Sequence, residues 1–386
     1  MLLMINRRRQ AALALTALLA AAAACQNHVR EERAAPPGHP APVVPAAGGF
    51  TLVASGDVMP QKSAVDHANF DAGGNGHDFR PMLAGVEPVV SRAGLALCHL
   101  ATVTGTDGGH AGLTSPPQLA EALAAIGYDS CSTASDRALD DGAAGIQRTL
   151  AALDRAGLRH SGTARTDAEA GTLTLLNAGR AKVAQLSYTY DVNGNSLPPG
   201  QPWAVGLLDE NRVLADARAA RQAGADVVVV SVHWGTEGTD APDQQQLTLA
   251  KRLTAASTGG RPDIDLLLGT HAHIPQAYEK VNGTWVVYGL GDQLAGEMNN
   301  AQGQQDPRGN QSTLARFTFT PPTRPGGRWE VAKAEFIPQL YDIDAGRVVD
   351  LNAAIDQGAD YTAARDAIRD VVLSRGAAKD GLVMGE

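Results

Sequence analysis

Hydrophobic and polar positions follow two alternating periods along the chain, and their order predicts an α/β fold. Short apolar runs typical of buried strands alternate with longer stretches that place apolar residues at helical spacing. The clearest strand is a nearly continuous valine run at 226–232, because a strand covered on both faces shows no polar alternation. The predicted strands span residues 50–55, 95–100, 128–133, 183–188, 226–232, 264–268 and 284–288.

Helical spacing occurs between most of these strands. Pro117 opens one predicted helix and Gly157 follows the end of another, as helix start and stop signals do. Strands that alternate with helices in this way indicate a mostly parallel central sheet. The predicted helices span residues 81–93, 117–126, 143–156, 210–223 and 244–256.

The last part of the chain has a different pattern. Residues 312–320 and 329–337 alternate polar and apolar side chains, which is typical of an antiparallel pair of strands. Helical spacing returns at 361–374, and we expect the chain to fray after that helix. We therefore predict a main domain at 49–345 and a C-terminal helical extension and tail at 346–386.

The first residues predict export. Three arginines at 7–9 precede an apolar stretch at 11–24, which is shorter than the ~20 residues that a membrane-spanning helix needs. Small residues lead into Cys25, so residues 1–25 have the layout of a lipoprotein signal with Cys25 as the lipidation site. This predicts a protein held at the outer face of the cell membrane by a lipid anchor. Ordinary signal cleavage, which leaves a secreted protein, is the alternative.

Composition narrows the classes of partner. Residues 26–48 are rich in alanine and proline without a hydrophobic period, which predicts a disordered tether. The net charge of −9 and the lack of a basic stripe argue against nucleic acid as a partner.

Besides Cys25, the chain contains only Cys98 and Cys131 as cysteines. An exported protein permits a disulfide between them, and two buried free thiols are the alternative.

Polar residues that follow the predicted strands are the candidates for chemistry. The carboxyl ends of parallel strands meet at one sheet edge, where ligands bind, so we expect these side chains to converge. The strongest local signal is Gly-Thr-His-Ala-His at 269–273. A single histidine there would more often be an ordinary hydrogen-bonded loop residue, but three imidazoles with two carboxylates suit a divalent ion such as Zn, Mn or Fe. The candidate metal ligands are Asp57, Asp136, His233, His271 and His273.

Four of these strand-end motifs, taken in order, resemble those of the capsule-synthesis CapA family. They are Gly-Asp-Val-Met at 56–59, the run 227–235 ending in His-Trp-Gly, the 269–273 motif, and Tyr-Gly-Leu-Gly-Asp at 288–292. The resemblance covers residues 50–293 and implies a metallophosphoesterase-like α/β sandwich with two central sheets flanked by helices. It also implies a binuclear metal site and a role with poly-γ-glutamate or another anionic capsule or cell-envelope polymer.

Two motifs depart from that family. The family's Asn-Leu-Glu is His-Leu-Ala at 99–101, so the carboxylate that the resemblance places between two metals is replaced by Ala101. The family's Asn-Asn-His is Ser-Asp-Arg at 135–137, and the guanidinium of Arg137 cannot act as a general acid, although it can bind an anion. We therefore expect at most one firmly bound metal, at Asp136, His233 and His271, with Asp57 and His273 at its edge.

The same departures separate the functional hypotheses. They favour an envelope protein that binds an anionic polymer or the capsule export machinery without cutting it. The surviving ligands favour the alternative, an active single-metal hydrolase or transferase of the CapA class. A purely structural surface lipoprotein is the third hypothesis. Metal content distinguishes the structural lipoprotein from the other two hypotheses. Turnover of a substrate distinguishes the hydrolase or transferase from the polymer-binding protein.

Overall fold

The structure is a computed structural model that describes residues 48–105, 114–299, 303–324 and 327–386. The chain divides into two units, and all of the described residues belong to the second, Pro40–Glu386. The predicted export signal, its Cys25 and nearly all of the tether lie outside the described residues. None of the helices within those ranges combines the length and the apolar character needed to cross a membrane.

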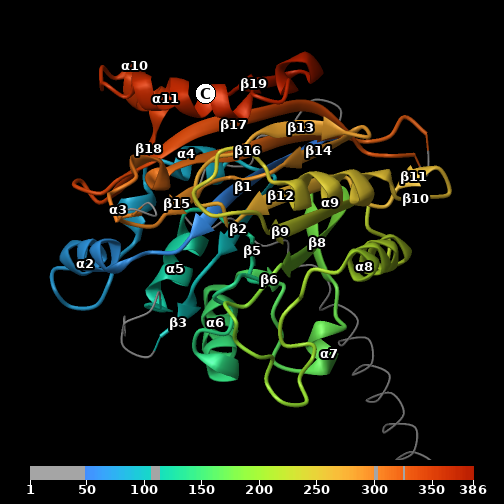
Figure 1. Ribbon diagram of the computed structural model, residues 1–386, viewed down its shortest axis with the longest axis horizontal. Coiled ribbons are helices and arrows are strands. Elements are labelled where there is room, and N and C mark those ends of the chain that lie inside the picture. Colours follow the sequence, from blue (N-terminus) through green and yellow to red (C-terminus); the bar gives the residue numbers. More distant parts are fainter. Residues whose placement is uncertain (1–47, 106–113, 300–302, 325–326) are drawn as a thin grey trace, which may run out of the picture. The chain divides into compact units, whose positions relative to one another are not determined.

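The larger of two central sheets has nine strands (Figure 1). They are β1 Phe50–Val58, β2 Leu95–Leu100, β5 Ser130–Ser132, β6 Arg159–Ser161, β15 Asp292–Leu294, β16 Gln311–Thr320, β17 Glu330–Asp342, β18 Arg347–Asp350 and β19 Leu382–Met384. The order is β18-β17-β16-β1-β2-β5-β6, with β15 beside β1 and β19 beside β17. Strands β1, β2, β5 and β6 are parallel, whereas β16, β17 and β18 continue the sheet as antiparallel strands.

The second sheet has six strands, in the order β13-β14-β12-β9-β8-β7. In chain order they are β7 Thr174–Ala178, β8 Ala181–Thr189, β9 Val227–His233, β12 Leu266–Thr270, β13 Tyr278–Val281 and β14 Thr284–Val287. The four inner strands are parallel, and the edge strands β7 and β13 are antiparallel to their neighbours. Two short pairs stand apart, β3 Val103–Thr104 with β4 Thr114–Ser115, and β10 Ser257–Thr258 with β11 Arg261–Pro262.

Helices cover the outer faces of the two sheets (Figure 1). The nine-stranded sheet packs against α2 Lys62–Asp71, α3 Arg80–Leu83, α4 Glu87–Val90, α5 Gln118–Ala125 and α6 Gly142–Ala156. The six-stranded sheet packs against α8 Glu210–Gln222 and α9 Gln244–Ala255. The short α7 Asp167–Ala170 precedes β7, and α10 Leu351–Asp356 and α11 Thr362–Val372 contact β17.

The sheets face each other across a shared apolar core. Leu52 and Leu95 of the first sheet pack in one buried cluster with Val229 and Leu266 of the second. Separate clusters lie under the helices on each outer face. The predicted α/β sandwich with two central sheets flanked by helices is therefore confirmed.

Most of the predicted elements are present, but two expectations are wrong. The single helix expected at 81–93 is two short helices, α3 and α4, because Pro88 lacks the N–H and clashes with the carbonyl that a continuous helix would need. The chain also does not fray after residue 374. It forms a 3₁₀ turn at Ala377–Asp380 and then β19, which pairs in parallel with β17. Helix α2 was not predicted.

Cys98 and Cys131 lie opposite each other on neighbouring strands β2 and β5 and form a disulfide. Of the two alternatives that the sequence leaves open, the structure contains the bonded pair. The next residue on each strand, His99 and Ser132, is also paired across the same two strands. The disulfide therefore ties together two strands at the point where they deliver polar side chains to the sheet edge.

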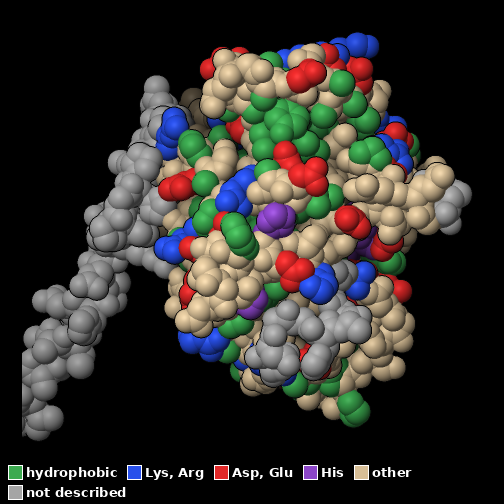
Figure 2. Space-filling model, turned by 90° about the vertical axis from the view of Figure 1, so that its left-hand side faces the viewer, with side chains coloured by type: hydrophobic (Ala, Val, Ile, Leu, Met, Phe, Trp, Pro, Cys, Tyr) green, Lys and Arg blue, Asp and Glu red, His purple; other side chains and the backbone are tan. Residues whose placement is uncertain are grey.

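Acidic and basic side chains are interspersed on the face drawn in Figure 2. No stripe of lysine and arginine is seen among the described side chains of that face.

Candidate metal centre

The site lies where the carboxyl ends of strands from both sheets converge. Asp57 stands near the end of β1, and a register shift between Ala54 and Asp57 places it opposite His99 on β2 and Asp292 on β15. Gly56 permits this approach, since a Cβ atom there would overlap the carbonyl of Gly291. The close packing of backbone thus sets the position of the first carboxylate.

The loop after β12 supplies two histidines through an unusual backbone. His271 and His273 have φ angles of 89° and 62°, in the left-handed region that few residues other than glycine adopt. The backbone N–H of His271 donates to Asp57 Oδ2 at 3.1 Å. Such conformations are held only where surrounding contacts enforce them, and they gather at functional sites.

The five predicted ligands are all buried and lie in one cluster of histidines and carboxylates. Four groups of three residues place one potential ligand atom each within 4.8 Å of one another. These groups are Asp57-His99-His233, Asp136-His233-His271, Glu237-His271-His273 and Asp57-His273-Asp292. The structure therefore brings together Asp57, Asp136, His233, His271 and His273, and adds His99, Glu237 and Asp292 to them.

His99 is oriented by a hydroxyl group. Ser132 Oγ lies 2.7 Å from His99 Nδ1 and 3.2 Å from the carbonyl oxygen of Cys98. The other nitrogen of His99, Nε2, lies 3.0 Å from His233 Nδ1 and 3.5 Å from Asp57 Oδ1. His99 therefore presents a ligand atom to the centre of the cluster.

His233 contacts polar groups through both of its ring nitrogens. Its Nδ1 lies 3.0 Å from His99 Nε2 and 3.2 Å from Thr270 Oγ1. Its Nε2 lies 3.0 Å from the carboxylate oxygen Oδ1 of Asp136. The ring therefore connects His99 to the Asp136 carboxylate at the centre of the cluster.

Two buried atoms of the cluster lack a hydrogen-bond partner, Asp57 Oδ1 and His271 Nδ1. Both belong to residues of the metal-ligating type, and leaving such atoms unpaired away from water costs free energy. A divalent cation would satisfy them. The imidazole nitrogens and carboxylate oxygens of the cluster are therefore a donor set that could hold a metal ion.

The His273 side of the cluster is different, because its groups already satisfy one another. His273 Nδ1 lies 2.9 Å from Asp292 Oδ1, and His273 Nε2 lies 3.7 Å from Glu237 Oε1. Burial lowers the pKa of His273, but the Asp292 and Glu237 carboxylates outweigh it and hold this pKa well above its ordinary value. Burial raises the pKa of Asp292 to about 6. At neutral pH the pair is an imidazolium with a carboxylate.

Burial is also the largest single influence on the pKa values of Asp57, His99, His271 and Asp136. Burial raises the pKa of Asp57 and holds the pKa of His99 well below its ordinary value. Burial also lowers the pKa of His271 to about 3, so this imidazole is neutral and able to ligate. Burial opposes the charged form of Asp136, but the hydrogen bond and charge of His233 outweigh it, and the pKa of Asp136 lies well below its usual range.

Three more side chains border the cluster. Arg137 follows Asp136 directly, and its Nη1 lies 3.3 Å from Asp140 Oδ2 while its Nε has no partner. Tyr190 is 39% exposed, and its ring centre lies 4.7 Å from that of His271. Ala101 is buried just beyond the end of β2. The cluster thus has a cation and an aromatic ring at its border.

Sequence reasoning did not propose His99, Asp292 or Glu237 as ligands. His99 and Asp292 had a signal, since each is a polar residue at or just after the end of a predicted strand, 95–100 and 284–288. The resemblance drew attention to Ala101 instead. Glu237 lies in a loop and is exposed, and nothing in the local sequence marks it.

A two-sheet α/β sandwich with buried histidines and carboxylates at the carboxyl ends of its central strands defines a protein with a candidate metal centre. The chain belongs to the bacterial capsule synthesis protein family, PGA_cap, whose family model matches residues 51–297. This match contains every residue of the cluster, from Asp57 to Asp292. The family predicted from the motifs is confirmed.

Two relatives illustrate the range of similarity. A capsule biosynthesis protein CapA of Bacillus anthracis is 25% identical over 183 residues, covering 47% of this chain and 43% of the relative. A probable polyglutamine synthesis accessory protein of Mycobacterium tuberculosis is 28% identical over 189 residues, covering 46% of this chain and 47% of the relative. The chain therefore spans less than half the length of these curated relatives.

Solved structures give more distant likenesses. A putative 5'-nucleotidase from Staphylococcus aureus has 14% sequence identity and a TM-score of 0.46, covering 75% of this chain and 54% of that one. A calcineurin-like phosphoesterase from Bacillus subtilis has 13% identity and a TM-score of 0.44, covering 83% of this chain and 99% of that one. The α/β fold itself is shown by the two sheets and their helices.

Proposed function

We propose that this chain is an envelope-anchored protein of capsule synthesis that holds one divalent metal and binds an anionic polymer such as poly-γ-glutamate. Membership of the capsule synthesis family supports the link to such a polymer. The partner is the polymer itself or the export machinery that carries it. Binding rather than hydrolysis is the main activity in this proposal.

The observation that carries the proposal is a buried cluster of metal-ligating side chains in which two potential ligand atoms, Asp57 Oδ1 and His271 Nδ1, have no partner. One potential ligand atom each of Asp136, His233 and His271 lies within 4.8 Å of the others. Asp136, His233 and His271 would hold the metal. Three protein ligands leave an open position for another donor. A metal there would supply a positive charge and Lewis acidity toward a carboxylate.

Two replacements speak against cleavage. The methyl of Ala101 cannot coordinate, so nothing at that position bridges a second metal. Arg137 stands where the family has a histidine, and a guanidinium does not serve as a general acid. It can bind a carboxylate instead, because its side chain is partly exposed beside Asp140. Arg137 and the metal would together recognise the anionic groups of a polymer.

An active single-metal hydrolase or transferase is the second candidate. The open metal position favours it, because a metal with three protein ligands can activate a bound water. In that case the neutral imidazole of His99, held by Ser132, is a buried base near the metal. Turnover separates the two candidates.

Metal analysis is the decisive experiment. We expect the full chain, purified without chelators, to contain close to one equivalent of a divalent transition metal, and to bind poly-γ-glutamate without shortening it. A preparation that contains no metal and cannot take up Zn, Mn or Fe contradicts the proposal. If the protein shortens the polymer and loses this activity when the metal is removed, it is an active enzyme instead.

The envelope anchor has its own test. We expect wild-type protein in the membrane fraction, and a Cys25→Ser variant that is either released or retained as uncleaved precursor. A chain that starts near Gly48 should be soluble and folded, since residues 26–48 are rich in alanine and proline and have no hydrophobic period. Wild-type protein that is free in the medium with an unmodified Cys25 contradicts the anchor.

A further inference from the structure

The deepest part of the cluster contains a triangle of potential ligand atoms on the Nδ1 side of His233. His99 Nε2 lies 3.0 Å from His233 Nδ1. Asp57 Oδ1 lies 3.5 Å from His99 Nε2 and 3.6 Å from His233 Nδ1. Ligand atoms about 2.0–2.2 Å from a tetrahedral zinc ion lie roughly 3.3–3.6 Å from one another. The three atoms therefore have nearly the spacing of ligands around one metal ion.

The remaining ring nitrogens of both histidines face oxygen atoms. His99 Nδ1 lies 2.7 Å from Ser132 Oγ, and His233 Nε2 lies 3.0 Å from Asp136 Oδ1. A histidine that ligates a metal almost always donates its other ring N–H to an oxygen acceptor, which fixes the orientation of the ring. Both rings are thus oriented as metal-ligating histidines are, with Asp136 as a supporting carboxylate.

The position of His99 is set by the sheet rather than by a loop. The Cys98–Cys131 disulfide joins β2 to β5 one residue before His99 and Ser132, and these two residues are themselves paired across the strands. On the other side of β2, His99 lies opposite Asp57 of β1. The ligand atoms of Asp57 and His99 are therefore held by neighbouring strands of one sheet.

A single proton does not satisfy these atoms. A proton on one ring nitrogen would meet the contact between His99 and His233, but Asp57 Oδ1 would still be buried without a hydrogen-bond partner. A divalent cation would meet all three atoms at once. Thr270 Oγ1, which lies 3.2 Å from His233 Nδ1, borders the same place with a further oxygen.

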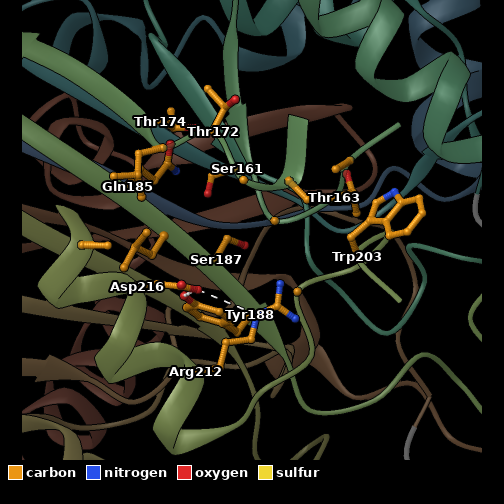
Figure 3. Close-up of a pocket in the computed structure, with 18 residues that line it drawn as sticks. Ser161, Thr163, Thr172, Thr174, Gln185, Ser187, Tyr188, Trp203, Arg212 and Asp216 are labelled. Atoms are coloured by element: carbon orange, nitrogen blue, oxygen red, sulfur yellow. Dashed lines mark hydrogen bonds and ion pairs between the residues drawn. The ribbon is translucent and has the colours of Figure 1, made fainter. Parts of the chain in front are cut away.

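The cavity drawn in Figure 3 does not offer a comparable set of ligands. It has a volume of about 210 Å³ and lies between strand β8 and helix α8. The described residues that line it include no histidine and no cysteine. Their one carboxylate, Asp216, accepts from Tyr188 at 2.8 Å and lies 3.8 Å from Arg212. This carboxylate is already paired within the protein.

We propose that Asp57, His99 and His233 form an inner position for the metal. The inner position rests on the proposed function for the presence of one metal, and it adds a second place for that metal. The outer position, at Asp136, His233 and His271, lies on the Nε2 side of His233, because that nitrogen faces Asp136. A neutral imidazole has only one nitrogen free to ligate. The two positions are therefore alternatives for a single metal.

The two positions differ in their access to solvent. The ligands of the inner position, Asp57, His99 and His233, are each at most 2% exposed. The outer position is bordered by Tyr190, which is 39% exposed and whose ring centre lies 4.7 Å from that of His271. A metal in the inner position is enclosed by the fold, and a metal in the outer position is closer to the surface that a polymer can reach.

Zinc titration of the chelator-treated full chain tests the proposal. His271→Gly removes a ligand of the outer position alone, and glycine accepts the left-handed backbone there. We expect this variant still to bind one equivalent of Zn²⁺. Adding His99→Phe keeps a flat ring and removes both nitrogens, so it should lower the affinity for Zn²⁺ by more than about 100-fold. Adding Ser132→Ala instead keeps the imidazole and removes its support, which should weaken Zn²⁺ binding about tenfold.

His67→Ala in the same His271→Gly background is the matched control. His67 lies on α2, outside the cluster, and its Nε2 contacts the carbonyl of Ile343. This control should bind Zn²⁺ as His271→Gly does. If the His99→Phe variant does not fold, Ser132→Ala decides alone.

Two results would overturn the inner position while leaving the proposed function in place. One is a His271→Gly variant that binds no Zn²⁺ although the wild type does. The other is a His99→Phe addition, or the Ser132→Ala addition where it decides alone, that binds Zn²⁺ as tightly as His271→Gly. Wild-type protein that binds no Zn²⁺, Mn²⁺ or Fe²⁺ overturns the proposed function together with the inner position.

Discussion

The two sides of the histidine cluster look alike in composition but differ in how their hydrogen bonds are met. On one side, His273 is paired with Asp292 at 2.9 Å and also faces Glu237. On the other side, His233 lies between His99 and Asp136, and His271 Nδ1 has no partner. The first side is an ion pair, and the second leaves a potential ligand atom unpaired.

This difference shows why a count of histidines and carboxylates does not locate a metal. A metal must displace the proton of a protonated imidazole before that imidazole can ligate, so a histidine already paired with a carboxylate binds a metal at a cost. An unpaired ligand atom carries no such cost. We therefore propose that Asp136, His233 and His271 form the metal side, with Asp57 between the two sides.

Replacing His233 should have the largest effect. His233 belongs to two of the four candidate groups and lies between His99 and Asp136. We expect His233→Ala to lose its metal, with affinity reduced by more than about 100-fold, since changes outside the ligand shell already cost 10–100-fold. Metal stoichiometry by elemental analysis is the measurement.

His273→Ala is the matched control for that change. It removes a histidine of the same cluster from the other side, and we expect it to retain the metal. If His273→Ala empties the protein while His233→Ala stays loaded, the two sides have been assigned the wrong way round.

Replacing Asp292 should affect stability rather than metal content. Asp292→Ala leaves the buried His273 without its partner, and removal of one member of a buried pair costs about 3 kcal/mol. Urea unfolding of chelator-treated protein measures the loss, with Asp292→Asn as the milder comparison because it keeps an acceptor. Loss of metal with an unchanged free energy of unfolding would show that Asp292 is a ligand instead.

Restoring the family's residues should have the smallest effect. Ala101→Glu with Arg137→His adds a carboxylate and an imidazole at the two positions that depart from the family motifs. We expect the double variant to bind more metal than the wild type, by less than one further equivalent, because the His273–Asp292 pair still competes for its own proton. A metal content equal to that of wild type argues that these two motifs are aligned wrongly with the family.

The fold could be predicted from the sequence where burial leaves a regular pattern. The valine run of β9 and the helical spacing of α6, which ends at Gly157 with a φ angle of 77°, are examples. Helix α2 was missed because its buried residues are mostly alanines and its first residue makes no side-chain cap. Strand β19 has three residues, which is too short for any period to appear.

The residues of the site could be predicted in outline, but the contacts that they make with one another could not. Motif order located all five predicted ligands in one buried cluster. The roles of His99 and Asp292 depend on which strands neighbour β1 and on a register shift at Asp57, which are properties of the folded chain. The pairing of His273 with Asp292 likewise joins residues that no local pattern connects.

The left-handed backbone at His271 and His273 also bears on how this site can vary among descendants of the same gene. Glycine and asparagine accept such φ angles readily, whereas valine or isoleucine add strain of about 1–3 kcal/mol to the loss of the imidazole. A lineage that no longer needs the metal should therefore drift toward glycine, asparagine or aspartate at these two positions, and away from branched side chains. The pattern of accepted substitutions would then record selection on the backbone separately from selection on the ligand.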